Sequence, residues 1–274
     1  MRWRDQRQST NVEDRRGMGG PMMIGGGGLG VIVLAIAVFL CGGDPSQFLQ
    51  NLPSEQPVSA PGQAANKPTT QDEQRQFVGA VMGSLEDYWR TSLSQKGGVG
   101  YKDPKLVLFT RQIQSACGYA SAATGPFYCP GDYRLYLDFA FFDELKREFK
   151  APGDFAQAYV IAHEFGHHIQ NLEGTMRRVQ NAGNSNRLSV AVELQADCYA
   201  GLWANYAQQK GLVEAGDVEE AVRAAGAVGD DMIQRRTQGY VVPDSFTHGS
   251  AQQRMQYFAI GFKTGNMAEC RTLR

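Results

Sequence analysis

The spacing of apolar residues predicts a series of helices in the second half of the chain. Between residues 154 and 172 apolar positions recur mostly at steps of three to five, as in a helix with one buried face: Phe155, Tyr159, Val160, Phe165, Ile169 and Leu172. Pro152-Gly153 breaks the chain before this segment, and Asp154 can cap the start of the helix. The same spacing predicts helices at 141–149, 187–208, 217–227 and 250–263.

Two short segments before residue 140 have the pattern of strands. Lys105–Thr110 (KLVLFT) is an apolar run, and Tyr133–Phe139 (YRLYLDF) alternates between apolar and polar residues. A helix is expected ahead of them, at the helical steps of Phe77, Val81, Leu85, Tyr88 and Trp89. Because strands come first and helices dominate after residue 140, we expect an α+β domain that is mostly helical.

The N-terminal part of the chain contains an uncharged apolar stretch from Met22 to Cys41. Its length matches the hydrocarbon core of a bilayer, about 30 Å, so 22–41 is predicted to be a transmembrane helix. An excess of arginine in the preceding segment predicts that 1–21 is cytoplasmic and that the rest lies outside the cytoplasmic membrane. That segment contains Arg2, Arg4, Arg7, Arg15 and Arg16 against Asp5, Glu13 and Asp14.

A cleaved signal peptide is the main alternative to this anchor. Its apolar core would be Leu29–Leu40, but no small-x-small cleavage site follows, since Cys41-Gly42-Gly43 leads directly into Asp44-Pro45. A lipoprotein-like cut before Cys41 is a further alternative, with poor spacing. The length of the apolar stretch favours the uncleaved, single-pass anchor.

Composition separates the anchor from a globular domain. Residues 44–72 hold five of the eleven prolines together with polar residues, so 42–73 is predicted to be a linker and 74–274 the folded domain. The chain has 27 basic and 28 acidic residues and a formal net charge of −1. Since it has no basic run, a nucleic-acid partner is not expected.

The segment His163-Glu164-Phe165-Gly166-His167 lies in the middle of the helix predicted at 154–172. His163 and His167 are four residues apart and stand on one face of a helix, with Cβ atoms roughly 5–6 Å apart. Two imidazoles at this spacing can bind one Zn²⁺ ion at about 2.0–2.1 Å. Glu164 points to the side of that ion, where it can act as a general base on a water molecule.

Two further residues of this helix are expected to be structural. Gly166 lowers helix stability by roughly 1 kcal/mol relative to alanine, and its small size would let a second backbone approach the metal side of the helix. His168 is about 100° further round the helix than His167. We therefore interpret His168 as a packing or hydrogen-bonding residue rather than a ligand.

A catalytic zinc site usually has three protein ligands, and Glu193 is the candidate for the third. Asp197 follows one helical turn later on the same face, where it can accept the N–H of a ligand histidine and fix its tautomer. The alternative is that both carboxylates lie on a solvated face, but the surrounding helix is largely apolar. The prediction is one Zn²⁺ ion bound by His163, His167 and Glu193.

His248 lies in the segment Pro243–Gly249, a predicted loop ahead of the last helix. Loops held on a scaffold often carry function, so His248 is a candidate catalytic residue that donates a hydrogen bond to an oxyanion. The alternatives are a further metal ligand and an ordinary residue near the start of the helix. Tyr240 and Arg254 are weaker candidates of the same kind.

The predicted domain contains four cysteines: Cys117, Cys129, Cys198 and Cys270. They allow three pairings, which the sequence does not separate, and free thiols in a reducing compartment are the alternative. We favour the pairs Cys117–Cys129 and Cys198–Cys270. The first pair would pin a flexible loop and add roughly 3 kcal/mol of stability. Disulfides agree with a domain outside the cytoplasm.

Three segments together resemble the bacterial putative neutral zinc metallopeptidase family: 163–167, Glu193-Leu194-Gln195-Ala196-Asp197-Cys198, and Pro243–Gly249. The resemblance covers nearly the whole chain, and the Glu-x-x-x-Asp element is similar to that of gluzincin peptidases. It implies a zincin-like metallopeptidase domain behind one membrane span. It also implies that His163, His167 and Glu193 bind zinc, that Glu164 is the catalytic base and that Asp197 orients a ligand.

The sequence therefore predicts a membrane-anchored zinc metalloendopeptidase that hydrolyses peptide or protein substrates. The strand at Tyr133–Phe139 is a candidate edge for binding an extended substrate. One alternative is a membrane-tethered binding or scaffold protein with a structural zinc, for which His248 would be the fourth ligand. The other is a zinc hydrolase that acts on a non-protein substrate.

Overall fold

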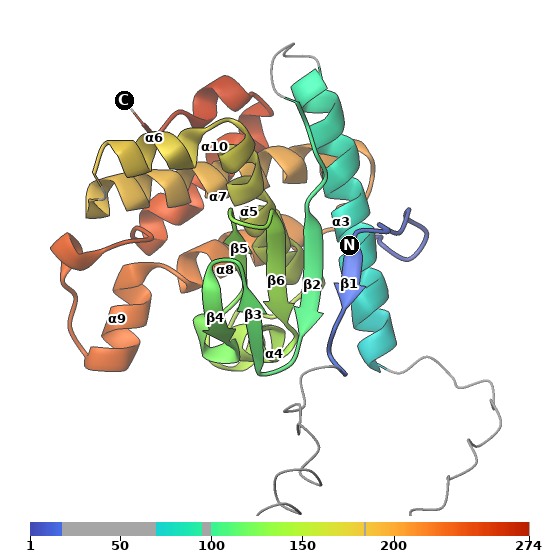
Figure 1. Ribbon diagram of the computed structural model, residues 1–274, viewed down its shortest axis with the longest axis horizontal. Helices are drawn as coiled ribbons and strands as arrows, with labels where there is room; N and C mark the ends of the chain where they lie inside the picture. Colours follow the sequence, from blue (N-terminus) through green and yellow to red (C-terminus); the bar gives the residue numbers. More distant parts are fainter. Residues whose placement is uncertain (18–69, 95–99, 184, 274) are drawn as a thin grey trace, which may run out of the picture.

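A mixed four-stranded sheet packs against a group of helices (Figure 1). The computed structural model describes residues 1–17, 70–94, 100–183 and 185–273. The strand order is β1 (Val12–Asp14), β2 (Lys105–Phe109), β6 (Arg134–Asp138) and β5 (Phe127–Cys129). β1, β2 and β6 are parallel, and β5 is antiparallel to β6 with its other edge unpaired among the described residues.

Alternation along β2 and β6 sends successive side chains to opposite faces of the sheet. Leucines from both strands enter the main core beneath the helices: Leu106, Leu108, Leu135 and Leu137. The other face carries a smaller apolar cluster: Val107, Phe109, Cys129 and Tyr136. A hairpin of β3 (Gln112–Ser115) and β4 (Gly118–Ser121) contributes Ile113 to this second cluster.

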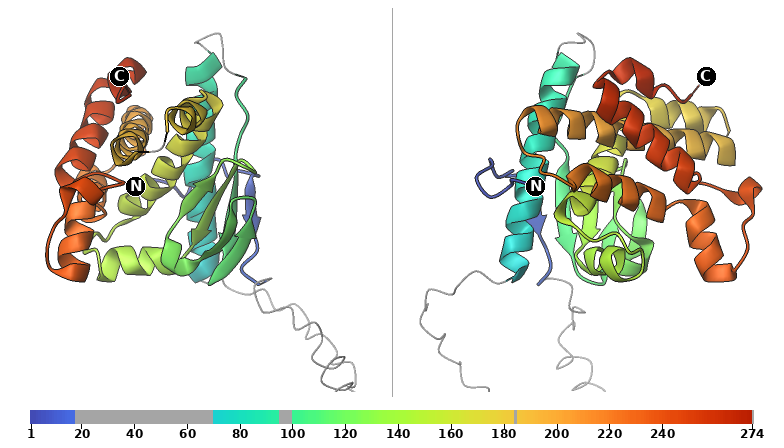
Figure 2. Two further views of the ribbon diagram at one scale, coloured as in Figure 1. Left: turned by 60° about the vertical axis from the view of Figure 1, so that its left-hand side comes forward. Right: turned by 180° about the vertical axis from the view of Figure 1, so that it is seen from behind.

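The helices agree closely with the predicted α+β, mostly helical fold. They are α3 (Thr70–Ser94), α4 (Ala140–Arg147), α5 (Asp154–Leu172), α6 (Thr175–Asn181), α7 (Asn186–Gln209), α8 (Asp217–Ala227), α9 (Asp230–Gln238) and α10 (Ala251–Thr264), with 3₁₀ turns η1 (Ala122–Thr124), η2 (Pro243–Ser245) and η3 (Met267–Cys270). α5 lies between the sheet and the helices α7, α8 and α10 (Figure 2). The sequence did not predict α6, α9, β5 or the β3–β4 hairpin.

Glycines allow three of these helices to approach closely. A Cβ atom at Gly166 of α5 would lie 3.1 Å from the Cα and carbonyl oxygen of Ala196 in α7, so the expected approach of a second backbone is confirmed. A Cβ atom at Gly201 of α7 would collide with the carbonyl oxygen of Phe258, and one at Gly261 of α10 would collide with a carbonyl of α7. These contacts fix α7 against α10 and α5 against α7.

Residues 1–17 form an N-terminal arm that packs on the domain, although the sequence predicted a separate cytoplasmic segment at 1–21. β1 pairs in register with β2, with Glu13 opposite Val107. The buried carboxylate of Glu86 in α3 accepts hydrogen bonds from three residues of the arm: Arg7, Ser9 and Asn11. Met1 and Trp3 enter the main core. The arginines that favoured a cytoplasmic location therefore belong to a segment that is part of the fold.

The predicted membrane span at 22–41 lies outside the described residues, as does most of the predicted linker at 42–73. Its last residues, 70–73, form the first turn of α3, so the domain begins slightly earlier than predicted. Within the described ranges, no helix has the length and apolar character needed to cross a membrane.

Candidate metal centre and active site

The motif residues of α5 meet Glu193 of α7 at one point. Nε2 of His163 lies 3.1 Å from one carboxylate oxygen of Glu193, and Nε2 of His167 lies 3.4 Å from the other. Ligands bound tetrahedrally at 2.0–2.1 Å are separated by about 3.3 Å, so these atoms can surround one zinc ion with little movement. They form a cluster of possible metal ligands that contains the three predicted residues. Two nitrogens and one carboxylate match the donor set of catalytic zinc sites.

Asp197 holds His163 from the side opposite Glu193. Its carboxylate lies 2.9 Å from Nδ1 of His163 and accepts a hydrogen bond from Tyr159. Arg254 of α10 donates to both oxygens of Asp197, at 2.9 and 3.0 Å. With Nδ1–H donated to a carboxylate, the lone pair of Nε2 is available for a metal. Arg254, a weaker candidate in the sequence, is therefore part of the site.

The charges at the centre match one divalent cation. The carboxylates of Glu164, Glu193 and Asp197 carry one negative charge each and Arg254 one positive charge, which leaves two negative charges for a Zn²⁺ ion to balance. Without the ion, burial opposes protonation of His163, but the charge and hydrogen bond of Asp197 and the hydrogen bond of Glu193 raise its pKa to about 10. The site therefore takes up protons when it has no metal.

Glu164 lines the groove beside the ligands and is half-buried. Burial raises the pKa of its carboxyl group above the usual range, while the neighbouring histidines His167 and His163 act in the opposite direction. A carboxylate with a raised pKa is a stronger base, which suits a general base that operates near neutral pH.

A groove of about 710 Å³ runs past the metal ligands. On one side it is lined by the segment Ala123–Tyr128, which leads into β5, and by Phe141 and Phe149 near α4. On the other side it is lined by residues of α9 and by His248. The free edge of the sheet at this groove is β5. β6 pairs with β2 and β5, so the prediction that Tyr133–Phe139 offers an edge to a substrate was wrong.

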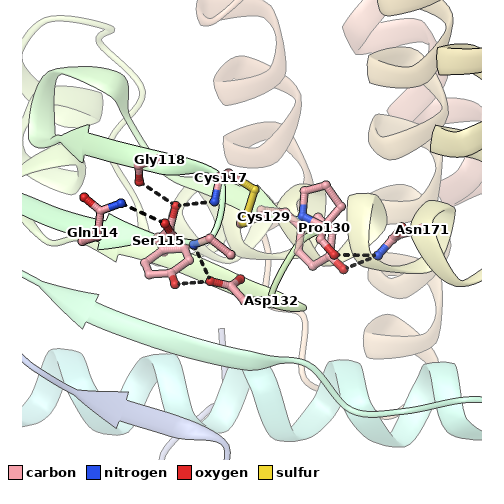
Figure 3. The surroundings of a disulfide bond; sticks show 11 residues. Gln114, Ser115, Cys117, Gly118, Cys129, Pro130, Asp132 and Asn171 are labelled. Carbon is pink, nitrogen blue, oxygen red and sulfur yellow. Dashed lines mark hydrogen bonds between the residues drawn. A yellow bond between two sulfur atoms is a disulfide. The ribbon is translucent and has the colours of Figure 1, made fainter.

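A disulfide fixes the groove wall near β5. Cys117, at the turn of the β3–β4 hairpin, is bonded to Cys129 at the end of β5 (Figure 3). Asn171 of α5 donates to the carbonyl of Pro130 and to the hydroxyl of Tyr128, which ties the same strand to the metal helix. The second disulfide joins Cys198 of α7 to Cys270 of η3. Both favoured pairings are confirmed.

His248 lies at the groove but outside the cluster of metal ligands. Its Nδ1 is 3.1 Å from a carboxylate oxygen of Asp230, and the side chain is 53% exposed. The hydrogen bond with Asp230 raises the pKa of His248, and burial only partly opposes it. Asp230 also accepts the backbone N–H groups of Thr247, His248 and Gly249, so it shapes the whole loop. Asp230 could not be predicted from the sequence, because no motif contains it.

His168 and Tyr240 are placed away from the metal ligands. His168 is fully buried, with Nε2 2.7 Å from the carbonyl of Lys102 and Nδ1 3.2 Å from the hydroxyl of Tyr128. Burial lowers its pKa to about 4, so it is a neutral hydrogen-bonding residue, as predicted. Tyr240 is 63% exposed and is not among the groove residues.

A second group of carboxylates among the described residues consists of Asp154, Asp217 and Glu220. It has no nitrogen ligand, and the amino group of Met1 already lies within hydrogen-bond distance of Asp154 and Asp217. The centre on α5 is therefore the better metal site.

Two histidines and a glutamate on one helix, with a further glutamate from a second helix, are the residue set of the catalytic zinc sites of metallopeptidases. The sequence profile of the putative neutral zinc metallopeptidase family matches residues 1–273, and the chain belongs to that family.

Relatives of similar length occur in distant bacteria. The chain is 46% identical over 284 aligned positions to the uncharacterized protein YpfJ of Escherichia coli K12, covering 99% of this chain and 98% of the relative. It is 40% identical over 254 positions to the uncharacterized protein Rv2575 of Mycobacterium tuberculosis H37Rv, covering 85% and 84%. No solved structure matches the chain.

Proposed function

We propose that this protein is a zinc-dependent endopeptidase that binds one Zn²⁺ ion through His163, His167 and Glu193. The observation that carries the proposal is the arrangement of the centre. Three protein ligands converge, while Glu164 lies beside them at the groove and His248 stays outside the cluster. Three ligands leave a coordination position open, as catalytic zinc sites do.

Glu164 is the general base in this proposal. When bound, the zinc ion supplies a Lewis acid that polarises a carbonyl group and lowers the pKa of water to about 7. The carboxylate of Glu164 accepts a proton from the attacking water and returns it to the leaving amine. Its raised pKa helps it to do both, because the carboxyl group must hold the proton between the two steps.

His248 donates a hydrogen bond to the oxyanion of the tetrahedral species. Since the Nδ1–H group of His248 donates a hydrogen bond to Asp230, a second donation from Nε2 requires the imidazolium form. The raised pKa of His248 favours that form near neutral pH. Asp230 therefore orients His248 and keeps it charged, and removal of an oxyanion donor lowers kcat by about 10²–10³-fold in other hydrolases.

The substrate is a peptide segment in an extended conformation. β5 has a free edge, and Phe127 and Tyr128 of this strand line the same groove as the metal ligands. An extended peptide can add to such an edge through main-chain hydrogen bonds. This would place a peptide bond next to Glu164 without any rearrangement of the sheet.

A structural-zinc scaffold is less well supported than an enzyme. That alternative needs a fourth protein ligand, and His248 does not belong to the cluster of possible ligands. A hydrolase of a non-protein substrate would use the same residues and is separated from a peptidase by the substrate alone.

The test combines metal analysis with peptide digestion. Full-length protein and the Glu164→Gln variant are assayed for bound zinc and incubated with a peptide library. We expect about one zinc per chain in both proteins, cleavage by the wild type, and a loss of at least about 10²-fold in kcat for the variant. Equal cleavage by both proteins would refute the role of Glu164. Zinc binding without any peptide cleavage would favour a non-protein substrate.

We also propose that the domain lies outside the cytoplasmic membrane and is attached through residues 22–41. The two disulfides support an oxidising compartment. Because β1 pairs with β2, this location requires residues 1–17 to lie on the same side of the membrane as the domain.

A further inference from the structure

The second metal ligand, His167, is held by an amide instead of a carboxylate. Its Nδ1 lies 2.9 Å from Oε1 of Gln170, one turn further along α5. Gln170 is completely buried, although it carries a polar amide. A buried amide must satisfy its donors and acceptor, so its partners reveal how it is oriented.

The partners of Gln170 fix the tautomer of His167. Nε2 of Gln170 lies 2.7 Å from the carbonyl oxygen of Val192 and 3.1 Å from Oε1 of Gln195. Val192 offers only a carbonyl, so the NH₂ group must face it, and Oε1 must face His167. His167 therefore carries its proton on Nδ1, which leaves the lone pair of Nε2 for the metal.

Gln195 accepts a hydrogen bond from Gln170 and donates one in turn. Its Oε1 accepts from Gln170, and its Nε2 donates to the carbonyl oxygen of Cys270 at 3.1 Å. Cys270 is buried and bonded to Cys198 in α7, only three residues beyond Gln195. The disulfide thus holds the last acceptor of the chain of hydrogen bonds in place.

We propose that Gln170 and Gln195 form an amide relay that positions His167 for zinc and ends on the disulfide-held carbonyl of Cys270. The inference rests on the proposed zinc site. Every N–H of the relay points away from His167, so the amides polarise one another and strengthen the bond to Nδ1. His163 is oriented by the ionic partner Asp197, whereas His167 is oriented by neutral groups that add no charge to the centre.

A double-mutant cycle on zinc affinity tests the relay. The variants Gln170→Met, Gln195→Met and the double variant are made in the full-length protein, and the zinc Kd is measured by competition with a chromogenic chelator. Gln208→Met is the matched control, because Gln208 is an exposed residue of α7. We expect Gln170→Met to raise Kd about 10–100-fold, Gln195→Met on the order of tenfold, and the control to leave Kd unchanged.

The size of the double variant's effect separates a relay from two independent contacts. If both residues act through His167, the double variant binds zinc within about twofold of Gln170→Met alone. Additive losses, or unchanged affinity in either single variant, would overturn the relay. Thermal unfolding of the metal-free proteins provides the control for folding, and Gln195→Met carries the test if Gln170→Met does not fold.

The same titration distinguishes failure of the relay from failure of the zinc site. Wild-type protein that does not bind zinc would refute the proposed metal centre. Wild-type protein that binds zinc tightly, with all variants unchanged, would refute the relay alone. Opening the disulfide with Cys198→Ser and Cys270→Ser is expected to weaken zinc binding in wild type but to add little in the Gln195→Met background.

Discussion

At the scale of single residues, the metal centre depends on groups that orient its ligands. Asp197 is buried, which raises the pKa of its carboxyl group, but the guanidinium group of Arg254 against both oxygens outweighs burial and lowers this pKa. A buried carboxylate without such a partner would be strongly destabilising. The ligands themselves are therefore only part of what a zinc ion requires from this fold.

The Asp230–His248 pair predicts how activity depends on pH. The hydrogen bond with Asp230 raises the pKa of His248. The imidazolium form is therefore lost as the pH rises through this raised value, and the stabilising ion pair with Asp230 is lost with it. The pKa of Asp230 is lowered: burial raises it, but the bonds with His248 outweigh burial, so the pair is also lost at acid pH. Asp230→Asn should move the alkaline limb of kcat/KM to lower pH, towards about 6.5.

Measured pH–rate profiles of Asp230→Asn and Asp231→Asn check this prediction. Asp231 is the next residue of α9 and accepts the backbone N–H of Ala251 without contacting His248, which makes it a matched control. An alkaline limb that is identical in wild type and Asp230→Asn would show that His248 does not act as the charged donor.

At the scale of secondary-structure elements, the Cys117–Cys129 disulfide controls one wall of the groove. It closes the loop that contains η1 and the groove residues ahead of β5. Replacing both cysteines by serine should lower stability by roughly 3 kcal/mol and raise KM several-fold, because the substrate edge becomes less ordered. Zinc affinity should stay unchanged, since no metal ligand is held by this bond.

Steady-state kinetics and zinc titration of Cys117→Ser/Cys129→Ser provide the measurement. The Cys198→Ser/Cys270→Ser variant is the natural comparison, because that bond holds the carbonyl group of Cys270 that accepts from Gln195. A fall in kcat with unchanged KM, or weaker zinc binding in the first variant, would contradict a role confined to the substrate edge.

The helices that the sequence predicted best are those with a long apolar period. α5, α7, α8 and α10 were predicted within a few residues, and the motif supplied His163, Glu164, His167 and the partner pair on α7. β5 is only three residues long, and α9 (DDMIQRRTQ) is almost all polar, so neither has a recognisable period. Gln170, Gln195 and Asp230 belong to no motif, and only the three-dimensional contacts reveal them.

At the scale of the whole molecule, the N-terminal arm and the domain form one unit. β1 ends and α3 begins at the same edge of the molecule (Figure 1). Three parallel strands share hydrogen bonds across this junction, and a single membrane crossing between residues 22 and 41 would separate β1 from β2. We therefore predict that residues 1–17 and the domain lie on the same side of the membrane.

Cysteine labelling in intact cells measures this arrangement. Gly17 is exposed, with no heavy atom within 4 Å of an added Cβ, and Gln252 is an exposed residue of α10. Gly17→Cys and Gln252→Cys are made separately with Cys41→Ser, and each is treated with a membrane-impermeant maleimide before and after lysis. Both positions should label in intact cells. Labelling of only one would contradict the sheet, and protection of both would contradict the extracytoplasmic location.

Because α10 packs across α7, the metal centre is completed late in the synthesis of the chain. Synthesis proceeds from the N-terminus, so all three ligands leave the ribosome before Arg254 and Cys270 have been made. Until then Asp197 lacks its guanidinium partner and Gln195 lacks its acceptor. The final geometry of the metal site is thus reached only after the C-terminal helix has packed against α7.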